Sequence, residues 1–125
     1  METINHEYYV SIEVAKLLKE AGFDWEIKTF YFMDQLGETM LGDAKNHNFS
    51  NQFISAPTLE VAQRWLREVK NIDVFAYRNE PKDKFESIVS FNKKWSTTGM
   101  CINTYEEALE TSIKKALEMI LEKSE

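Results

Sequence analysis

Residues 53–74, FISAPTLEVAQRWLREVKNIDV, decide the fold of this 125-residue chain. The apolar residues before Pro57 predict the end of a strand, because a proline keeps the residue before it extended. Thr58 is a typical helix cap, and the residues after it repeat with a helical period over Leu59–Lys70. A second strand is predicted from Ile72. The apolar stripe of the predicted helix consists of Leu59, Ala62, Trp65, Leu66 and Val69.

The residues before this segment predict a helix followed by a strand. Ser11 can cap a helix over Ile12–Ala21, and Gly22 supplies the left-handed residue that ends it. Trp25–Met33 is rich in aromatic and β-branched residues and therefore predicts a strand. A short edge strand is expected near residues 8–10.

Residues 34–52 are polar and carry the weakest structural pattern in the chain. A two-stranded turn around Thr39–Leu41, between Gly37 and Gly42, is one interpretation. The favoured interpretation is a mobile surface loop without a function, although connections of this length are often functional. The segment also contains Asp34, Glu38, Asp43 and His47, but their spacing matches no calcium loop, so we expect a solvated acidic loop.

The alternating pattern that begins at Ile72 predicts a strand, and residues 79–84, NEPKDK, predict a turn. Phe85–Phe91 is expected to return as the partner strand. Trp95–Ile102 is expected to add a third strand, with Gly99 as a bulge or turn. These strands follow one another as hairpins, which favours antiparallel pairing.

The last predicted element is a helix over Tyr105–Lys123, and Thr104 and Glu107 form a capping box at its start. Its apolar stripe consists of Leu109, Ile113, Ala116, Leu117, Ile120 and Leu121. The sequence therefore predicts an α+β fold, a small antiparallel sheet with about three helices packed on it, in a single domain over residues 1–125.

Three segments resemble a family of small uncharacterised proteins of gut-bacterial genomes and their phages. They are Ser11–Trp25, Ser55–Val74 with its APTLxxAxxWLRE string, and Asn103–Glu110. The resemblance implies a phage or mobile-element context. It brings no activity and no functional residues to this sequence, and residues 34–52 have no counterpart in it.

Composition limits the class of protein. The formal net charge is −6, whereas general nucleic-acid binding needs a basic footprint. No apolar run approaches the length of a membrane span, and the first residues, METINHEYY, lack the features of a signal peptide. The single cysteine, Cys101, excludes an internal disulfide. We therefore expect a cytoplasmic protein without a membrane partner.

The motifs of catalysis and metal binding are missing from the sequence. His6 and His47 are far apart, no C-x-x-C is present, and the four glycines form no phosphate-binding motif. Cys101 lies between Met100 and Ile102, so we expect it to be a small buried apolar residue. We expect no cofactor and no metal, and an enzyme is disfavoured, although a pair of carboxylates for hydrolysis stays open.

Charge is unevenly distributed, because residues 64–94 carry eight basic and five acidic side chains, a net charge of +3. Aromatic residues are interleaved with these basic residues, so the region 64–95 can be read as a phosphate-binding and base-stacking surface. The competing interpretation is a solvated hairpin with part of its aromatics in the core. The candidate partner-binding residues are Arg64, Arg67, Arg78, Lys82, Lys84 and Trp95.

The favoured function is a non-enzymatic accessory domain that binds another protein or itself. Aromatic residues make up 13% of the chain, and large aromatics serve both as core and as interface anchors. We therefore expect a homodimer or a higher oligomer. The alternative is a nucleic-acid accessory protein that uses residues 64–95. Trp65 is expected to lie in the core, the other possibility being an interface anchor.

Overall fold

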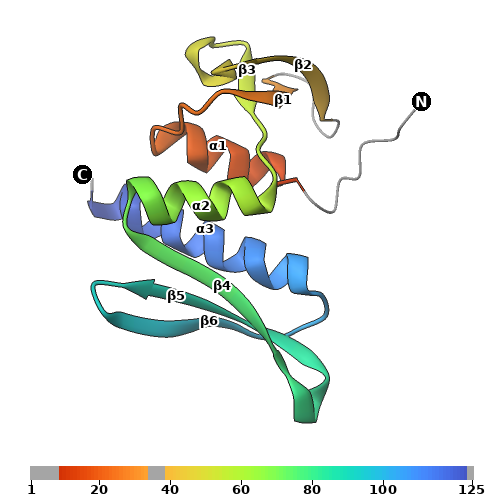
Figure 1. Cartoon of the computed structure of the whole chain (residues 1–125), viewed down its shortest axis with the longest axis vertical. Coiled ribbons are helices and arrows are strands. Elements are labelled where there is room, and N and C mark those ends of the chain that lie inside the picture. Colours follow the sequence, from red (N-terminus) through yellow and green to blue (C-terminus); the bar gives the residue numbers. More distant parts are fainter. Residues whose placement is uncertain (1–8, 34–38, 124–125) are drawn as a thin grey trace. The chain divides into compact units, whose positions relative to one another are not determined.

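The computed structural model describes residues 9–33 and 39–123, and the chain divides into two compact units (Figure 1). The N-terminal unit spans residues 1–58 and the C-terminal unit spans residues 59–125. Within the described residues there are three α-helices and two antiparallel sheets of three strands each, which confirms the α+β class. Some of the sequence-based expectations concern residues outside the described ranges, namely His6, Tyr8, Asp34, Gly37 and Glu38.

The fold departs from the prediction in having two small sheets rather than one. Strands β1 to β3 pair among themselves in the N-terminal unit, and β4 to β6 pair among themselves in the C-terminal unit. The three helices are divided in the same way, with α1 in the first unit and α2 and α3 in the second. That both units form a single domain stays a prediction.

In the N-terminal unit, helix α1 (Ile12–Glu20) begins where its sequence predicts and ends one residue earlier than predicted. The Ser11 hydroxyl accepts a hydrogen bond from the amide of Val14 at 3.3 Å. Gly22 has a φ of +98°, a conformation that side-chain-bearing residues rarely adopt. The chain can therefore leave the helix and bring the amide of Phe23 to the carbonyl of Leu18, 2.9 Å away.

The sheet of this unit has the strand order β2–β1–β3, from β1 (Ile27–Phe32), β2 (Met40–Lys45) and β3 (Phe53–Ser55). The prediction of a mobile polar loop is wrong for the described part of residues 34–52, which contains β2 and a short 3₁₀ helix, η2 (His47–Phe49). Every residue of β2 is exposed, so the strand carries no apolar alternation that the sequence could reveal.

Side chains hold the segment after β2 in place. The Asn48 carboxamide accepts from the amide of Ser55 at 2.7 Å and donates to the carbonyl of Phe23 at 2.9 Å. The ammonium group of Lys19, from α1, donates to the carbonyls of Ser50 and Phe53, each at 2.7 Å. These long-range bonds satisfy backbone groups that a free loop would expose to water.

The C-terminal unit opens with α2 (Leu59–Val69), followed by β4 (Ile72–Asn79), η3 (Glu80–Lys82) and β5 (Lys84–Phe91). It closes with β6 (Lys94–Ile102) and α3 (Tyr105–Lys123), as the sequence predicts within one or two residues. Asn71 leaves α2 with a φ of +57°. The hydroxyl of Thr104 accepts from the amide of Glu107 at 3.1 Å, the capping bond expected for α3.

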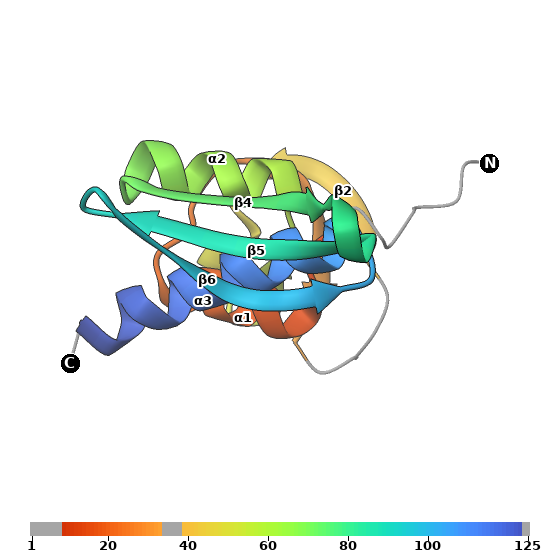
Figure 2. The same cartoon turned by 90° about the horizontal axis from the view of Figure 1, so that it is seen from below.

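Helices α2 and α3 lie on the same side of the β4–β5–β6 sheet (Figure 2). Ile72, Val74 and Val89 on these strands face the helices and are each at most 3% exposed. Strand β6 approaches α3 so closely at Gly99 that an added Cβ would meet Ile102 at 2.9 Å and Thr111 at 3.2 Å. The pairing register of β5 with β6 shifts at this point, as the predicted bulge requires.

Most of the apolar stripe residues predicted for α2 and α3 are buried. The predicted stripe residues that are buried are Leu59, Ala62, Trp65, Leu66, Leu109, Ile113, Ala116 and Leu117. Ile120 and Leu121, near the end of α3, are half-buried. Val69 is 51% exposed, so its assignment to the stripe of α2 is wrong. It stands in the last turn of the helix, just before the chain turns into β4 at Asn71.

Trp65 is 1% exposed, as expected for a core residue. We predict that Trp65→Ala lowers the free energy of unfolding by about 3–5 kcal/mol through the cavity it leaves. Val69→Ala on the same helix is the matched control and should change it by less than about 0.5 kcal/mol. Denaturant unfolding of both variants, with the oligomeric mass measured on the same samples, tests this. An unchanged midpoint for Trp65→Ala would contradict the core assignment.

Candidate functional site

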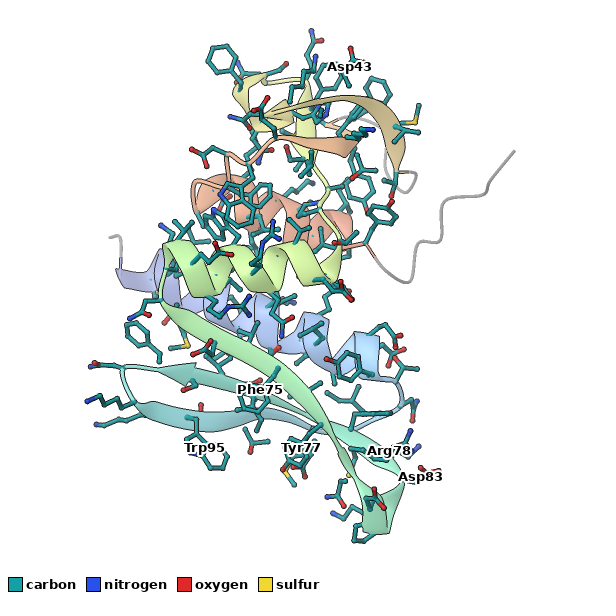
Figure 3. All side chains as sticks on the ribbon, in the orientation of Figure 1. Asp43, Phe75, Tyr77, Arg78, Asp83 and Trp95 are labelled. Atoms are coloured by element: carbon teal, nitrogen blue, oxygen red, sulfur yellow. The ribbon has the colours of Figure 1, made fainter. Side chains whose placement is uncertain are left out.

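The outer face of the β4–β5–β6 sheet, opposite the two helices, is the candidate site. Strand β4 pairs with β5 without interruption from Ile72–Phe91 to Asn79–Lys84, so successive residues alternate between the two faces. Ile72 and Val74 face the helices, and Phe75 and Tyr77 therefore face outward. Figure 3 shows Phe75, Tyr77 and Trp95 on the side of the sheet away from α2 and α3.

The outward residues form three cross-strand rows. Asp73, Ser90 and Trp95 make the first row, and Phe75, Ile88 and Thr97 make the second. Tyr77 and Glu86 make the third row. Met100 lies beside this row on the outer face, because it follows Gly99, where an added Cβ would meet Thr111 of α3. We call these three rows, together with Met100, the aromatic face.

Several large apolar side chains of the aromatic face are accessible to solvent. Trp95 is 66% exposed, Met100 59%, Tyr77 43% and Phe75 39%. Ile88, at the centre of the middle row, is fully buried although it points outward, since its neighbours in the rows cover it. An apolar cluster of this kind on a sheet surface is typical of an interaction site.

Polar contacts fix the third row of the aromatic face. The Tyr77 hydroxyl donates to one carboxylate oxygen of Glu86, and the Asn79 amide donates to the other at 3.1 Å. The hydrogen bond from Tyr77 lowers the pKa of Glu86, and the same bond raises the pKa of Tyr77. Glu86 therefore stays ionised and bonded, although it is only 7% exposed. Tyr77 is held in one orientation while its ring stays accessible.

The charge of the aromatic face is acidic. Its two ionisable carboxylates are Asp73 and Glu86, and among the described residues its three rows contain no lysine or arginine. The depletion of lysine and the excess of aromatic residues match the composition of interface cores. A surface that binds a phosphate backbone would need the opposite charge.

The six predicted partner-binding residues lie at three places in the C-terminal unit. Arg64 and Arg67 lie on α2, and Trp95 lies on the aromatic face. Arg78, Lys82 and Lys84 lie at the β4–β5 turn, where Arg78 pairs with Asp83 at 2.6 Å and Lys84 donates to Asn103 at 2.6 Å. The arginines of α2 and the basic residues of the turn therefore belong to different elements and do not form the single basic region that the sequence suggested.

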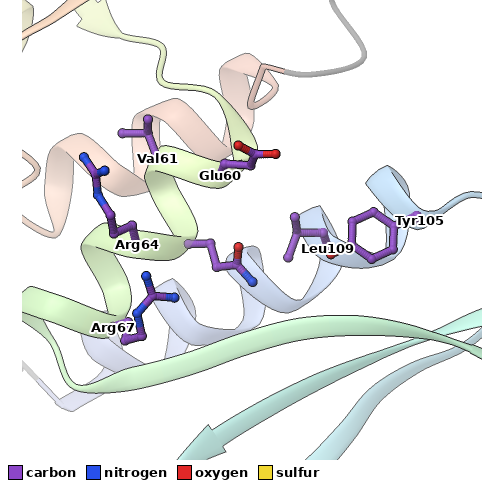
Figure 4. A pocket seen from close by; sticks show the side chains of 7 residues that line it. Glu60, Val61, Arg64, Arg67, Tyr105 and Leu109 are labelled. Atoms are coloured by element: carbon purple, nitrogen blue, oxygen red, sulfur yellow. The ribbon is translucent and has the colours of Figure 1, made fainter.

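Arg64 and Arg67 line a cavity of about 350 Å³ between α2 and α3 (Figure 4). The other residues that line it are Glu60, Val61, Gln63, Tyr105 and Leu109. Leu109 is 2% exposed and closes the bottom, while Tyr105 is 42% exposed at the rim. The Gln63 amide is fixed by a hydrogen bond of 2.7 Å to the carbonyl of Val74.

Cys101 was expected to be buried, and this is wrong. Its side chain is exposed, because its φ of +60° interrupts the alternation of β6 next to Ile102. Residues 9–33 and 39–123 contain no group of three or more His, Cys, Asp or Glu side chains placed to hold a metal ion. None of the helices in these ranges is long and apolar enough to cross a membrane.

His47 was expected in a solvated loop, and this is also wrong, because it is 2% exposed. Its ring stacks on Phe30 with centroids 4.5 Å apart. Its Nε2–H donates to the carbonyls of Ile27 at 2.9 Å and Asp43 at 3.2 Å, so Nδ1 carries no proton in the neutral ring. Nδ1 is buried without a hydrogen-bond partner among the described residues.

Comparison of the chain with protein-family models, with curated proteins and with solved structures gives no significant match.

Sequence reasoning named Trp95 but missed Phe75, Tyr77 and Met100 as members of the same surface. The signal for the first two was present, since they alternate with the buried Ile72 and Val74. Met100 could not be assigned to a face, because the register shift near Gly99 changes the alternation of β6.

The environment of His47 predicts a pH dependence of stability. Burial lowers its pKa below 6.5, with a smaller contribution from Lys45, while the bonds to Ile27 and Asp43 and the charge of Asp43 oppose the shift. The unfolded chain then binds the proton more tightly than the folded chain. The contribution of neutral His47 to the stability of the folded state is complete above pH 6.5. It is lost as the pH falls through and below that value.

The unfolding midpoint of the wild type should therefore fall as the pH is lowered from about 8 to about 5. His47→Gln keeps a donor for the Ile27 carbonyl and should flatten this dependence at a lower overall stability. The same slope in His47→Gln as in the wild type would contradict the assignment.

Proposed function

We propose that the protein is a non-enzymatic accessory domain that associates with a second copy of itself through the aromatic face. The observation that carries the proposal is the exposure of Trp95, Met100, Tyr77 and Phe75 around a fully buried Ile88. Ordered aromatic side chains on a rigid sheet lose little conformational entropy on association. The phage or mobile-element context implied by the family resemblance stays a prediction.

The pattern of the three rows favours a second copy as the partner. A two-fold axis that runs across the strands over the middle row sets the first row of one copy against the third row of the other. Trp95 then faces the second copy's Met100, Phe75 faces its own counterpart, and Asp73 faces the second copy's Tyr77. The contact between Trp95 and the sulfur of the second copy's Met100 is of a favourable kind.

The competing symmetry is disfavoured by charge. An axis parallel to the strands over β5 would place Glu86 on the second copy's Glu86, and the two ionised carboxylates would repel each other across the interface. The axis across the strands separates the acids, because Glu86 then faces Ser90. We therefore expect two sheets packed face to face, with their strands antiparallel and turned by the usual twist.

The size of the face predicts a weak dimer. Three strands about 4.8 Å apart and about eight residues long cover roughly 14 by 27 Å. This footprint is below the roughly 800 Å² that each partner buries in a standard interface. We expect a dissociation constant on the order of 10–100 µM, so dilution should separate the copies.

Sedimentation velocity from about 1 µM to about 1 mM tests the association. The wild type should pass from 14.7 kDa toward twice this mass. Trp95→Ala should weaken the association about thirtyfold, as loss of an aromatic anchor does, with an unchanged unfolding midpoint. Phe49→Ala is the matched control, because Phe49 is 91% exposed in the N-terminal unit.

Two results would contradict the proposal. One is a 14.7 kDa species alone at every concentration. The other is a dimer that Phe49→Ala weakens and Trp95→Ala does not, which would move the interface to the N-terminal unit.

Cross-linking tests the orientation. The chain has a single cysteine, so Thr97→Cys with Cys101→Ser gives one thiol on the proposed axis. The sheets should lie about 10 Å apart, within reach of a short bismaleimide, so this variant should cross-link efficiently. Ser96→Cys with Cys101→Ser is the control, because Ser96 pairs with Val89 on the inner face. Equal yields from the two variants would contradict the orientation.

A second candidate function, nucleic-acid binding through residues 64–95, has less support. Arg78 and Lys84 are engaged by Asp83 and Asn103, and Trp95 lies on an acidic face. Retention on single-stranded DNA at about 50 mM salt that is lost by about 200 mM would favour it over self-association.

A further inference from the structure

We propose that the cavity between α2 and α3 binds a small organic acid, a single carboxylate carried on an apolar or aromatic body. The cavity lies within the C-terminal unit and is distinct from the aromatic face, which is on the other side of the sheet. Its volume of about 350 Å³ is at the lower end of the range for small-molecule sites.

One end of the cavity is cationic. Arg64 and Arg67 stand one helical turn apart on α2, so both side chains reach the same side of the helix (Figure 4). Glu68 accepts from Nε of Arg64 at 3.3 Å, which orients that guanidinium group. Arg67 makes no ion pair among the described residues. A planar guanidinium fork matches the two oxygens of a carboxylate.

The remaining walls suit an uncharged body. Leu109 provides a buried apolar floor, and Tyr105 provides an aromatic ring at the rim. The Tyr105 ring is held edge-on by Phe85, with centroids 6.1 Å apart. Gln63 is tied to the backbone of β4, so it lines the wall as a fixed polar group. A ligand that is apolar away from its carboxylate can therefore bury that part.

The charge at the other end limits the ligand to one negative group. Glu60 lines the cavity two turns before Arg67, about 10 Å along the helix axis. A second anionic group there would meet the carboxylate of Glu60 without a counter-ion. The net charge of −6 on the whole chain adds to this repulsion. A monocarboxylate therefore fits better than a polyanion such as nucleic acid.

Benzoate is a suitable probe, and benzamide is its neutral isostere. Titration of the full chain followed by ¹H–¹⁵N NMR should shift the side-chain amide of Gln63 and the Nε–H of Arg64 and Arg67. Benzamide should leave these signals in place. Arg67→Gln should weaken benzoate binding about tenfold to a hundredfold, the usual effect of losing a hydrogen bond to a charged group. The side chain is exposed, so the variant should fold normally.

Arg78→Gln is the matched control, since it removes the same charge from the same unit outside the cavity. It should bind benzoate as the wild type does. Three outcomes would overturn the proposal: equal shifts with benzamide, unchanged binding in Arg67→Gln, or an equal loss in Arg78→Gln. Displacement of benzoate by inorganic phosphate or by oligothymidylate at a lower concentration than acetate would make the cavity a phosphate site and would also overturn it.

Discussion

The uninterrupted pairing of β4 with β5 is the constraint on which the C-terminal unit depends. Eight cross-strand pairs, from Ile72–Phe91 to Asn79–Lys84, fix which side chains meet the helices and which meet solvent. A slip of one residue would turn Ile72 and Val74 outward and would bring Phe75 and Tyr77 against the helices. The core and the aromatic face are therefore two consequences of one register, and neither can change without the other.

The parts of the fold that follow from local pattern were predictable. The helical stripes of α2 and α3, the capping bond of Thr104 and the left-handed exits at Gly22 and Asn71 all follow from residue type and spacing. Strand β2 was not predictable, because an edge strand with all of its residues exposed lacks alternation. The division into two sheets is a matter of long-range pairing, which a local pattern does not encode.

The candidate site was predictable only in part, for a related reason. Trp95 and the arginines of α2 are visible as residue types, but their grouping depends on strand order and on the contact between two helices. Tyr105 and Leu109 join Arg64 and Arg67 only because α3 returns beside α2. The environments of His47 and Cys101 were predicted in the wrong sense, since side-chain burial depends on neighbours distant in sequence or on a local break in the strand.

The two edges of the β4–β5–β6 sheet carry features that discourage further strand addition. At the β4 edge, the carbonyl of Val74 is already occupied by the side chain of Gln63. At the β6 edge, the register shift at Gly99 and the left-handed Cys101 interrupt the ladder that an incoming strand would need. Edge pairing is the route by which sheets grow without limit into fibres. Because both edges of this sheet are interrupted, strand addition at either edge is discouraged, and the sheet can expose aromatic side chains on its face without offering a template for fibre growth.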